Sequence, residues 1–171
     1  MPRLPMSPPC PIPDPIDQAA VHAAGFATVE LLGETASTME RARELAADPA
    51  CPLPALVVAD RQTHGRGRRG ARWWQPPGSL AASIVLGAGP GAGPVPTWSL
   101  ACGVALAETL RELEPAVEAL VRWPNDVEVG GRKLAGILVE TVAPGRVIFG
   151  IGVNTTGTAA AAPPALAARV A

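Results

Sequence analysis

The sequence predicts an α+β fold in which helices flank a mixed β-sheet. Three helical segments are scattered among strand-like segments up to about residue 114, and four strand-like segments then follow one another. A strictly alternating parallel fold would instead repeat strand and helix throughout. The chain has 171 residues, 48% of them hydrophobic, which is enough for one domain with a substantial core.

The chain opens with a Pro-rich segment over residues 1–15, which we expect to be a disordered leader. A short helix is expected over residues 16–24. Apolar side chains at Val29, Leu31 and Leu32 then favour a strand over residues 26–32.

The next segment, Ser37-Thr38-Met39-Glu40, fits the capping-box pattern and predicts a helix that ends before Asp48-Pro49. The apolar runs 55–59 and 80–86 have the length of strands. Because the run 55–59 is continuously apolar, it suits the middle of a sheet.

A Gly- and Pro-rich loop over residues 87–96 precedes the longest predicted helix, residues 97–114. Leu100, Val104, Leu106, Leu110 and Leu113 recur near helical spacing there, and Pro115 lies just past the end. Four strands are expected after it, with a tight hairpin at Ala143-Pro144-Gly145 between the last two; they cover residues 117–123, 127–129, 134–141 and 147–153.

Composition narrows the class of protein. Cys10, Cys51 and Cys102 are far apart and show no Cys-x-x-Cys spacing, which argues against a disulfide framework and a zinc site and favours the reducing cytoplasm. We find no signal-peptide pattern and no apolar run of about 18 residues, so no membrane association is expected. With a net charge of -1, any electrostatic function must be local.

The strongest local charge is the loop Gly65-Arg66-Gly67-Arg68-Arg69-Gly70. It matches a bare Gly-x-Gly-x-x-Gly pattern, but the residues from Trp73 to Pro77 cannot start the helix that a dinucleotide-binding fold needs. We expect a flexible clamp in which backbone amides and arginine forks bind an anion such as a nucleoside triphosphate. A solvated basic loop and a single-strand nucleic-acid patch remain open alternatives.

Other candidate residues fit the same chemistry. The helix start at Ser37-Thr38 and the amide of Gln62 could hold a polar ligand, although a helix cap and an ordinary loop residue would also be sufficient explanations. Asn125 and Asp126 could bind Mg²⁺ or phosphate, and the alternative is a turn. Lys133, the single lysine, is a point charge suited to phosphoryl or nucleotidyl transfer.

Four ordered blocks resemble the signature of biotin protein ligases: Gln62-Thr63-His64-Gly65-Arg66-Gly67-Arg68-Arg69-Gly70, Arg122-Trp123-Pro124-Asn125-Asp126, Arg132-Lys133-Leu134-Ala135-Gly136-Ile137-Leu138-Val139-Glu140 and Gly150-Ile151-Gly152-Val153-Asn154. The resemblance covers about residues 31–154. It implies the fold of class II aminoacyl-tRNA synthetase catalytic domains, with a mainly antiparallel sheet. It also implies an enzyme that makes biotinyl-5'-AMP from biotin and ATP, with Mg²⁺, and then biotinylates a lysine of a biotin carboxyl carrier protein domain, as in acetyl-CoA carboxylase.

By this resemblance Lys133 and Arg68 are the catalytic residues. The residues that would contact biotin are Ser37, Thr38, Gln62, Gly65, Arg66, Gly67, Arg68, Lys133 and Gly136. Those on the ATP side would be Arg68, Arg69, Trp73, Asn125, Asp126 and Asn154, with Mg²⁺ near Asn125 and Asp126.

The resemblance also divides the chain. Residues 16–156 would be the catalytic core and residues 157–171 an Ala- and Pro-rich tail. Family members continue with further helices and usually a small β-barrel, so we expect a truncated core, and without a helix-turn-helix segment we expect no DNA partner. A lipoate ligase, a truncated inactive homologue and a nucleic-acid-binding module remain the competing hypotheses.

Overall fold

A computed structural model of the chain describes residues 16, 18–76, 78–89, 96–142 and 145–155, together with residues 162, 163, 166 and 169. The predicted leader over residues 1–15 and most of the predicted tail lie outside the described residues. The domain boundaries therefore stay predictions.

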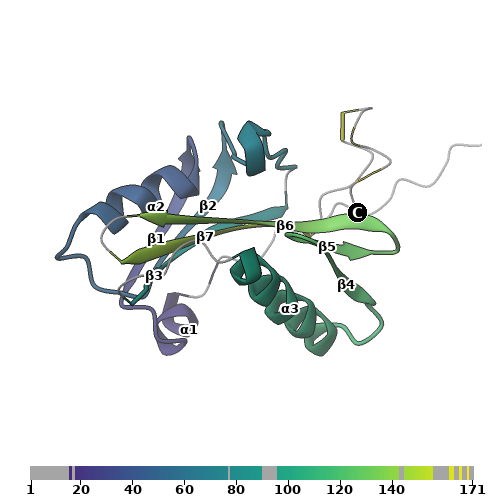
Figure 1. Cartoon of the computed structure of the whole chain (residues 1–171), viewed down its shortest axis with the longest axis horizontal. Coiled ribbons are helices and arrows are strands. Elements are labelled where there is room, and N and C mark those ends of the chain that lie inside the picture. The colour runs from purple at the N-terminus through teal and green to yellow at the C-terminus, as the bar shows by residue number, and fades with distance from the viewer. Residues whose placement is uncertain are drawn as a thin grey trace, which may run out of the picture.

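Seven strands form a single sheet in the order β1-β2-β3-β7-β6-β5-β4 (Figure 1). Only β1 and β2 pair in parallel, and every other neighbouring pair is antiparallel. The prediction of a mixed, mainly antiparallel sheet is confirmed. The strands are β1 Thr28–Thr35, β2 Ala55–Gln62, β3 Ser79–Gly87, β4 Ala119–Arg122, β5 Asp126–Val129, β6 Arg132–Val142 and β7 Arg146–Asn154.

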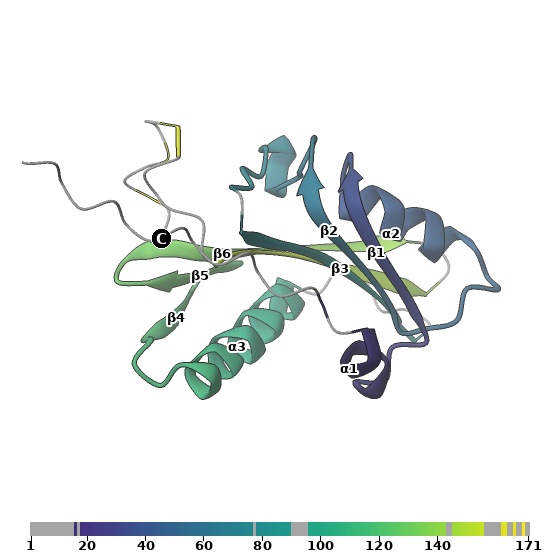
Figure 2. The same cartoon turned by 180° about the vertical axis from the view of Figure 1, so that it is seen from behind.

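Helices cover both faces of this sheet. The helix α2 (Thr38–Ala47) lies on one face, and α1 (Gln18–Ala23) and α3 (Pro96–Leu113) lie on the other (Figures 1 and 2). Side chains of β6 point alternately to the two faces of the sheet. Leu138 packs with the cluster under α2, while Ala135 and Ile137 pack with the cluster under α3. The order of elements therefore gives a three-layer arrangement.

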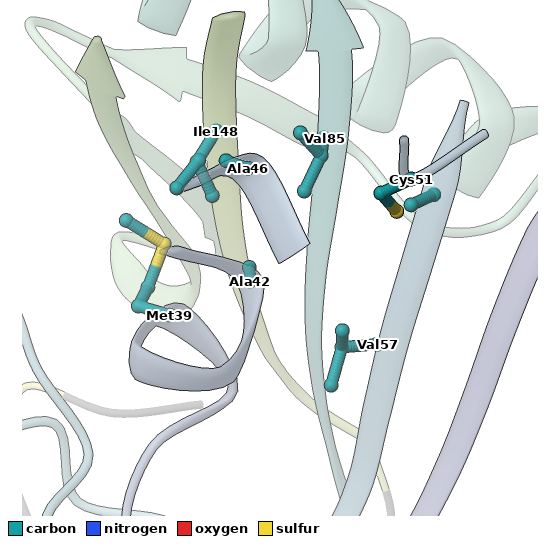
Figure 3. Packing of buried hydrophobic residues seen from close by; sticks show 8 residues of the cluster. Met39, Ala42, Ala46, Cys51, Val57, Val85 and Ile148 are labelled. Carbon is teal, nitrogen blue, oxygen red and sulfur yellow. The ribbon is translucent and has the colours of Figure 1, made fainter. Parts of the chain in front are cut away.

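The core beneath α2 is built from small and branched side chains. Met39, Ala42 and Ala46 of α2 pack on Val57, Val85 and Ile148 of three strands (Figure 3). Alanines let the helix approach the sheet closely, so the first turn of α2 is held against the strands. This packing fixes the position of the residues at the helix start.

The helix predictions are right to within a residue or two, but the capping box is wrong. Ser37 occupies the N-cap position of α2, with an extended backbone, yet its side chain makes no capping hydrogen bond. The Ser37 hydroxyl is instead fully buried and has no partner. A pattern that predicted a helix start correctly therefore assigned the wrong role to the side chain.

Two strands extend further than their apolar residues predicted. β1 continues to Thr35 instead of residue 32, and β2 continues to Gln62 instead of residue 59. Parallel pairing of Glu34 with Arg61 and of Thr35 with Gln62 carries both strands past their apolar segments. This extension places Gln62 directly beside the start of α2.

The C-terminal strands also differ at their ends. β4 is shorter than predicted, and β6 begins at Arg132, so Lys133 lies within the β5–β6 ladder, paired with Glu128 next to an irregularity in register. β6 and β7 pair along their lengths, as the predicted hairpin requires. Residues 143–144 of its turn, and residues 90–95 of the predicted Gly/Pro loop, lie outside the described part.

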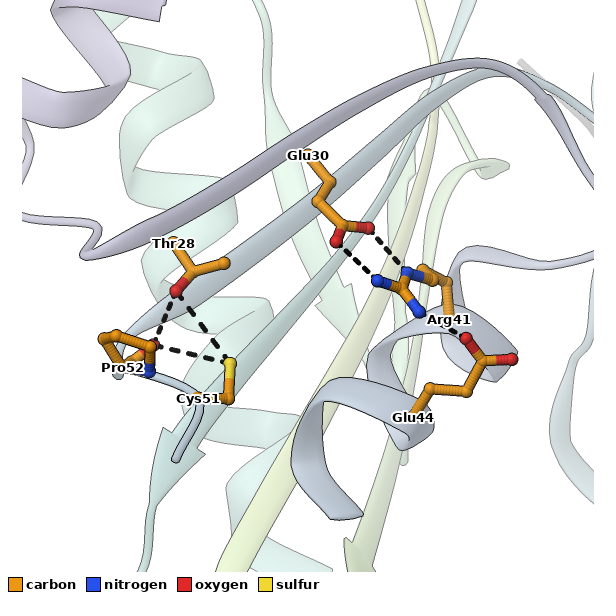
Figure 4. Close-up of polar contacts among 6 residues, drawn as sticks. All are labelled: Thr28, Glu30, Arg41, Glu44, Cys51 and Pro52. Carbon is orange, nitrogen blue, oxygen red and sulfur yellow. Dashed lines mark hydrogen bonds and ion pairs between the residues drawn. The ribbon is translucent and has the colours of Figure 1, made fainter. Parts of the chain in front are cut away.

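An ion pair ties α2 to the outer strand β1. Arg41 binds both carboxylate oxygens of Glu30 at 2.7 Å and also contacts Glu44, while Thr28 bonds to the Pro52 carbonyl nearby (Figure 4). The hydrogen bonds from Arg41 hold the pKa of Glu30 below its ordinary value. Neither Arg41 nor Glu30 lines the cavity described in the next section.

Candidate functional site

Glycines make a hollow on the α2 face of the sheet. A Cβ atom at Gly152 would lie 2.5 Å from Cε2 of Trp73, and one at Gly150 would lie 2.6 Å from Sδ of Met39. A Cβ atom at Gly136 would lie 3.0 Å from Nζ of Lys133. These glycines are therefore explained by close approach: β6 and β7 leave room for an indole ring, a thioether and an ammonium group.

Polar groups gather at one end of this hollow, where α2 begins. The Oε1 atom of Gln62 accepts hydrogen bonds from the Thr38 amide at 2.9 Å and from the Thr38 hydroxyl at 3.2 Å. The Ser83 hydroxyl donates to Thr38 Oγ1 at 2.8 Å. Beside them the buried Ser37 hydroxyl has no partner. Since a buried orphan hydroxyl is costly, this cluster is suited to a polar ligand.

The Arg/Gly loop is a small hairpin. The Gly67 amide donates to the Ala71 carbonyl at 2.7 Å and the Trp73 amide donates to the Gly65 carbonyl at 2.9 Å. These bonds correct the expected clamp in one respect, because the Gly67 amide is used within the loop and is not free to bind an anion. The hairpin presents arginine side chains instead.

Backbone geometry explains why the loop contains glycines. A Cβ atom at Gly65 would lie 3.0 Å from the Trp73 carbonyl oxygen, so this glycine permits close packing of the two arms. At the tip, Arg69 has φ 55° and Gly70 has φ 75°. A left-handed arginine is uncommon and costs conformational energy, which is a frequent property of ligand-binding loops.

The tip of the hairpin reaches the turn between β4 and β5. Arg68 Nη1 donates to Asn125 Oδ1 at 2.9 Å, and Asn125 Nδ2 donates to the Ile137 carbonyl at 3.0 Å. The next residue, Asp126, pairs with Lys133 through Oδ1 and Nζ at 2.7 Å. Lys133 Nζ also lies 5.5 Å from the centre of the Trp73 ring.

These groups line one cavity of about 400 Å³. Among the described residues, its lining carries five cationic side chains and a single carboxylate, that of Asp126; the cations are Arg66, Arg68, Arg69, Arg72 and Lys133. Such an excess of positive charge in a concave site attracts and orients anions. The other end of the cavity holds the polar cluster and the apolar side chains of Met39 and Leu138.

Most of the predicted site residues line this cavity: Ser37, Thr38, Gln62, Arg66, Gly67, Arg68, Arg69, Trp73, Asn125, Asp126, Lys133 and Gly136. Gly65 and Asn154 are not in the lining. Gly65 packs behind it against Gln62 and Trp73. Asn154 is buried, donates to the Lys133 carbonyl at 3.4 Å and leaves its own Oδ1 without a partner.

Sequence reasoning missed several residues of the site. Ser83 and Gln75 hold Thr38 and Gln62 in place, since Gln75 Oε1 accepts from the Gln62 amide at 2.9 Å. Ser83 interrupts an apolar strand segment, which is the one signal that could have identified it. Gly150 and Gly152 belong to the last of the four motif blocks, but their role in close packing depends on Met39 and Trp73, which are distant in sequence.

The expected Mg²⁺ position near Asn125 and Asp126 has few ligands. Asn125 Oδ1 accepts from Arg68, and Asp126 pairs with Lys133. Within the described residues no group of three His, Cys, Asp or Glu side chains could hold a metal ion. A magnesium ion here would depend on oxygens supplied by a phosphate ligand, which is the usual arrangement for Mg²⁺.

No helix within the described part of the chain is long and apolar enough to cross a membrane.

Comparisons with known proteins point to one family. The chain is 39% identical over 132 residues to a biotin--[acetyl-CoA-carboxylase] ligase of Paracoccus denitrificans, covering 74% of this chain and 54% of that protein. It is 35% identical over 147 residues to the enzyme of the same name from Mycobacterium tuberculosis, covering 82% of this chain and 54% of that protein. The chain thus spans about half the length of these curated relatives.

Two solved structures that resemble this chain are also biotin protein ligases. The biotin protein ligase from Aquifex aeolicus in complex with biotin and ATP matches with a TM-score of 0.73 and 31% identity, covering 85% of this chain and 59% of that one. The Leishmania major biotin protein ligase in complex with biotinyl-5-AMP matches with a TM-score of 0.68 and 29% identity, covering 77% and 59%. The profile of the biotin/lipoate A/B protein ligase family matches residues 33–156. The chain belongs to this family.

Proposed function

We propose that this chain is the catalytic core of a biotin protein ligase. It joins biotin to ATP as biotinyl-5'-AMP with release of pyrophosphate, and then transfers the biotinyl group to a lysine of a biotin carboxyl carrier protein domain of acetyl-CoA carboxylase or a similar carboxylase. The observation that carries the proposal is that Arg68 and Lys133 are two of the five cationic side chains that line one cavity, beside one carboxylate, among the described residues. The reducing cytoplasm expected from the cysteines suits this ATP-consuming reaction.

In the first step a carboxylate oxygen of biotin attacks the α-phosphorus of ATP, and the bond to pyrophosphate breaks. Negative charge concentrates where the two anions meet, so fixed cations stabilise the transition state more than the separate substrates. Arg68 and Lys133 supply that charge, and Asn125 and Asp126 orient them. Mg²⁺ would arrive with the phosphates and neutralise part of their charge, with Asp126 as the one carboxylate in the lining.

In the second step the lysine amine of the acceptor attacks the acyl carbon, and AMP leaves. The same cations stabilise the departing phosphate, so one constellation serves both steps.

The polar cluster favours biotin over lipoate. The ureido ring of biotin both donates and accepts hydrogen bonds, as do the hydroxyls of Ser37 and Thr38 and the amide of Gln62. The dithiolane ring of lipoate offers no such groups and would leave the buried Ser37 hydroxyl unpaired. The cavity therefore supports a ligase for biotin in preference to one for lipoate.

The test is exchange of labelled pyrophosphate into ATP with biotin or lipoate as the only acid, followed by transfer to a purified carrier domain. We expect biotin-dependent exchange and labelling of the carrier, and no labelling of a carrier whose acceptor lysine is changed to arginine. Lipoate-dependent exchange would establish the lipoate ligase instead. Calorimetric binding of biotin without any exchange would identify an inactive homologue.

The nucleic-acid hypothesis makes a different prediction in the same preparation. It requires binding to single strands that weakens steeply with salt and is indifferent to biotin. Arg68 engages Asn125 and Arg72 donates to the Thr63 carbonyl at 2.8 Å, so two of the loop arginines already have partners within the fold.

A further inference from the structure

Glu140, near the end of β6, joins three separate parts of the chain. Its Oε2 atom accepts from Nε of Arg43 at 2.8 Å and from Nη2 of Arg43 at 2.6 Å, which ties β6 to α2. Both side chains are about three quarters buried, with exposures of 28% and 26%. Its other oxygen, Oε1, lies 4.0 Å from Nη2 of Arg66 in the hairpin loop.

Arg66 is the member of this trio that lines the cavity. It lies on the first arm of the hairpin, opposite Arg72 on the second arm. The tip of the hairpin is anchored elsewhere, by the hydrogen bond from Arg68 to Asn125. The loop is therefore tied on two sides, to the β4–β5 turn through Arg68 and to β6 through Arg66.

We propose that Glu140 is a positioning residue that holds the hairpin over the cavity through Arg66. Arg43 weakens the attraction between Glu140 and Arg66, because it partly neutralises the Glu140 carboxylate. A carboxylate with one oxygen bound to Arg43 still attracts a second cation through the other oxygen, but less strongly because its charge is partly neutralised. This contact then raises the fraction of ligand-free molecules in which the hairpin lies over the cavity. This inference goes beyond the proposed reaction, in which neither Glu140 nor Arg43 takes part.

The two ends of the Arg43–Glu140 pair give opposite predictions. Glu140→Gln removes the charge that attracts Arg66, so the hairpin should open more often. Arg43→Gln leaves the Glu140 carboxylate unneutralised, so its attraction for Arg66 should be unchanged or stronger. If the pair only braced α2 against β6, both substitutions would act alike. The sign of the difference therefore separates loop positioning from structural support.

The chain contains a matched control. Arg41 and Glu30 form a two-bond ion pair that also joins α2 to a strand, at 2.7 Å for both bonds, and neither residue lines the cavity. Glu30→Gln should cost at least as much global stability as Glu140→Gln without touching the loop. Urea unfolding gives the free energy of unfolding of each variant. The cleavage rates can then be corrected for any change in global stability.

Limited proteolysis of the full ligand-free chain with trypsin is the measurement, because the hairpin offers Arg66, Arg68 and Arg69 as cleavage sites. When opening is rapid, the cleavage rate follows the population of the open loop. Loss of a partly exposed ion pair predicts hairpin cleavage about two- to fivefold faster in Glu140→Gln. Arg43→Gln should be cleaved at the unsubstituted rate or more slowly, and Glu30→Gln at the unsubstituted rate.

Equal acceleration by Glu140→Gln and Arg43→Gln, or no acceleration by Glu140→Gln, would overturn the proposal. These readings need no ligand, so they stand apart from the fate of the proposed function. A second reading rests on that function: Glu140→Gln should weaken biotin binding by a similar factor, because the ligand must then order the loop itself. If Glu140→Gln speeds cleavage of the hairpin but leaves the affinity for biotin unchanged, the Glu140–Arg66 contact does not hold the loop in its ligand-binding arrangement. That result would contradict the positioning role.

Discussion

Arg68 and Lys133 are held by two adjacent residues, at the point where the β4–β5 turn meets β5. Arg68 donates to Asn125 at 2.9 Å, and Lys133 pairs with Asp126 at 2.7 Å, although Arg68 and Asn125 are 57 residues apart in the chain. The β4–β5 turn therefore sets the spacing between a guanidinium group of the hairpin and an ammonium group of β6.

Lys133→Ala should lower biotin-dependent pyrophosphate exchange by about 100-fold or more, since it removes a fixed charge from the place where two anions react. Arg122→Ala is the control, because Arg122 is exposed, pairs with Glu128 and does not line the cavity. Exchange by Arg122→Ala should stay within about twofold of the unsubstituted chain. Comparable rates for the two variants would remove Lys133 from the mechanism.

Arg68→Ala should reduce adenylate formation by about 100-fold, with biotin still binding at the polar cluster. Arg61→Ala is the matched variant, since Arg61 precedes the same hairpin but pairs with Glu34 on the sheet surface at 3.2 Å. Quenched-flow measurement of biotinyl-5'-AMP separates the two. A large defect in Arg61→Ala as well would indicate a diffuse effect of loop charge.

Ser37→Ala should leave the ligand-free chain as stable as before, or stabilise it by up to about 1 kcal/mol, because it removes a buried hydroxyl that has no partner. Biotin affinity should fall about tenfold if that hydroxyl bonds to the ligand. Ser83→Ala should behave differently and destabilise the chain by about 1 kcal/mol, since Ser83 donates to Thr38. Urea unfolding and calorimetry test both, and an unaltered affinity in Ser37→Ala would exclude the contact.

Gly152→Ala should destabilise the chain by about 1–3 kcal/mol through a clash with Trp73. In a Trp73→Ala background the same substitution should cost clearly less, because the clashing ring is gone. Gly33→Ala, where a Cβ atom meets nothing within 4 Å, serves as the control. Equal costs of Gly152→Ala in both backgrounds would mean that Trp73 does not lie on this glycine.

Glu30→Gln should lower the free energy of unfolding at pH 7 by about 0.5–1 kcal/mol, a small effect because Arg41 is 37% exposed. The pKa of Glu30 is lowered in the folded chain, chiefly by hydrogen bonds from Arg41. The stabilisation is therefore present above the ordinary pKa of 4.5 and is lost as pH falls through the folded value. Urea titrations at pH 7 and near pH 3 should show the variant and its parent converging.

Local patterns were sufficient for most of the elements. The spacing of leucines gave α3 to within one residue, with Pro96 at its first position where a missing amide does no harm. Polar ends of strands were not predictable, because Glu34–Arg61 and Thr35–Gln62 pair across two strands that are distant in sequence. Hydrophobic patterning contains no information about such pairing.

The residues of the site were recognised individually, but their mutual arrangement was not. The loop glycines were expected to free backbone amides, whereas the hairpin uses the Gly67 amide internally. The capping box was expected at Ser37, whereas packing of α2 leaves that hydroxyl buried and unpaired. In both cases the same residue types fit two local geometries, and contacts from other strands decide between them.

The amino-acid order alone determined which chemical groups were available: a basic Arg/Gly loop, a hydroxyl-bearing helix start, an Asn-Asp pair and one lysine. Folding decided that these groups share a cavity, that Asn125 and Asp126 space the two principal cations, and that Glu140 faces the loop. The reason is that Coulomb and hydrogen-bond energies depend on distances in space, which long-range strand pairing sets and local sequence does not contain.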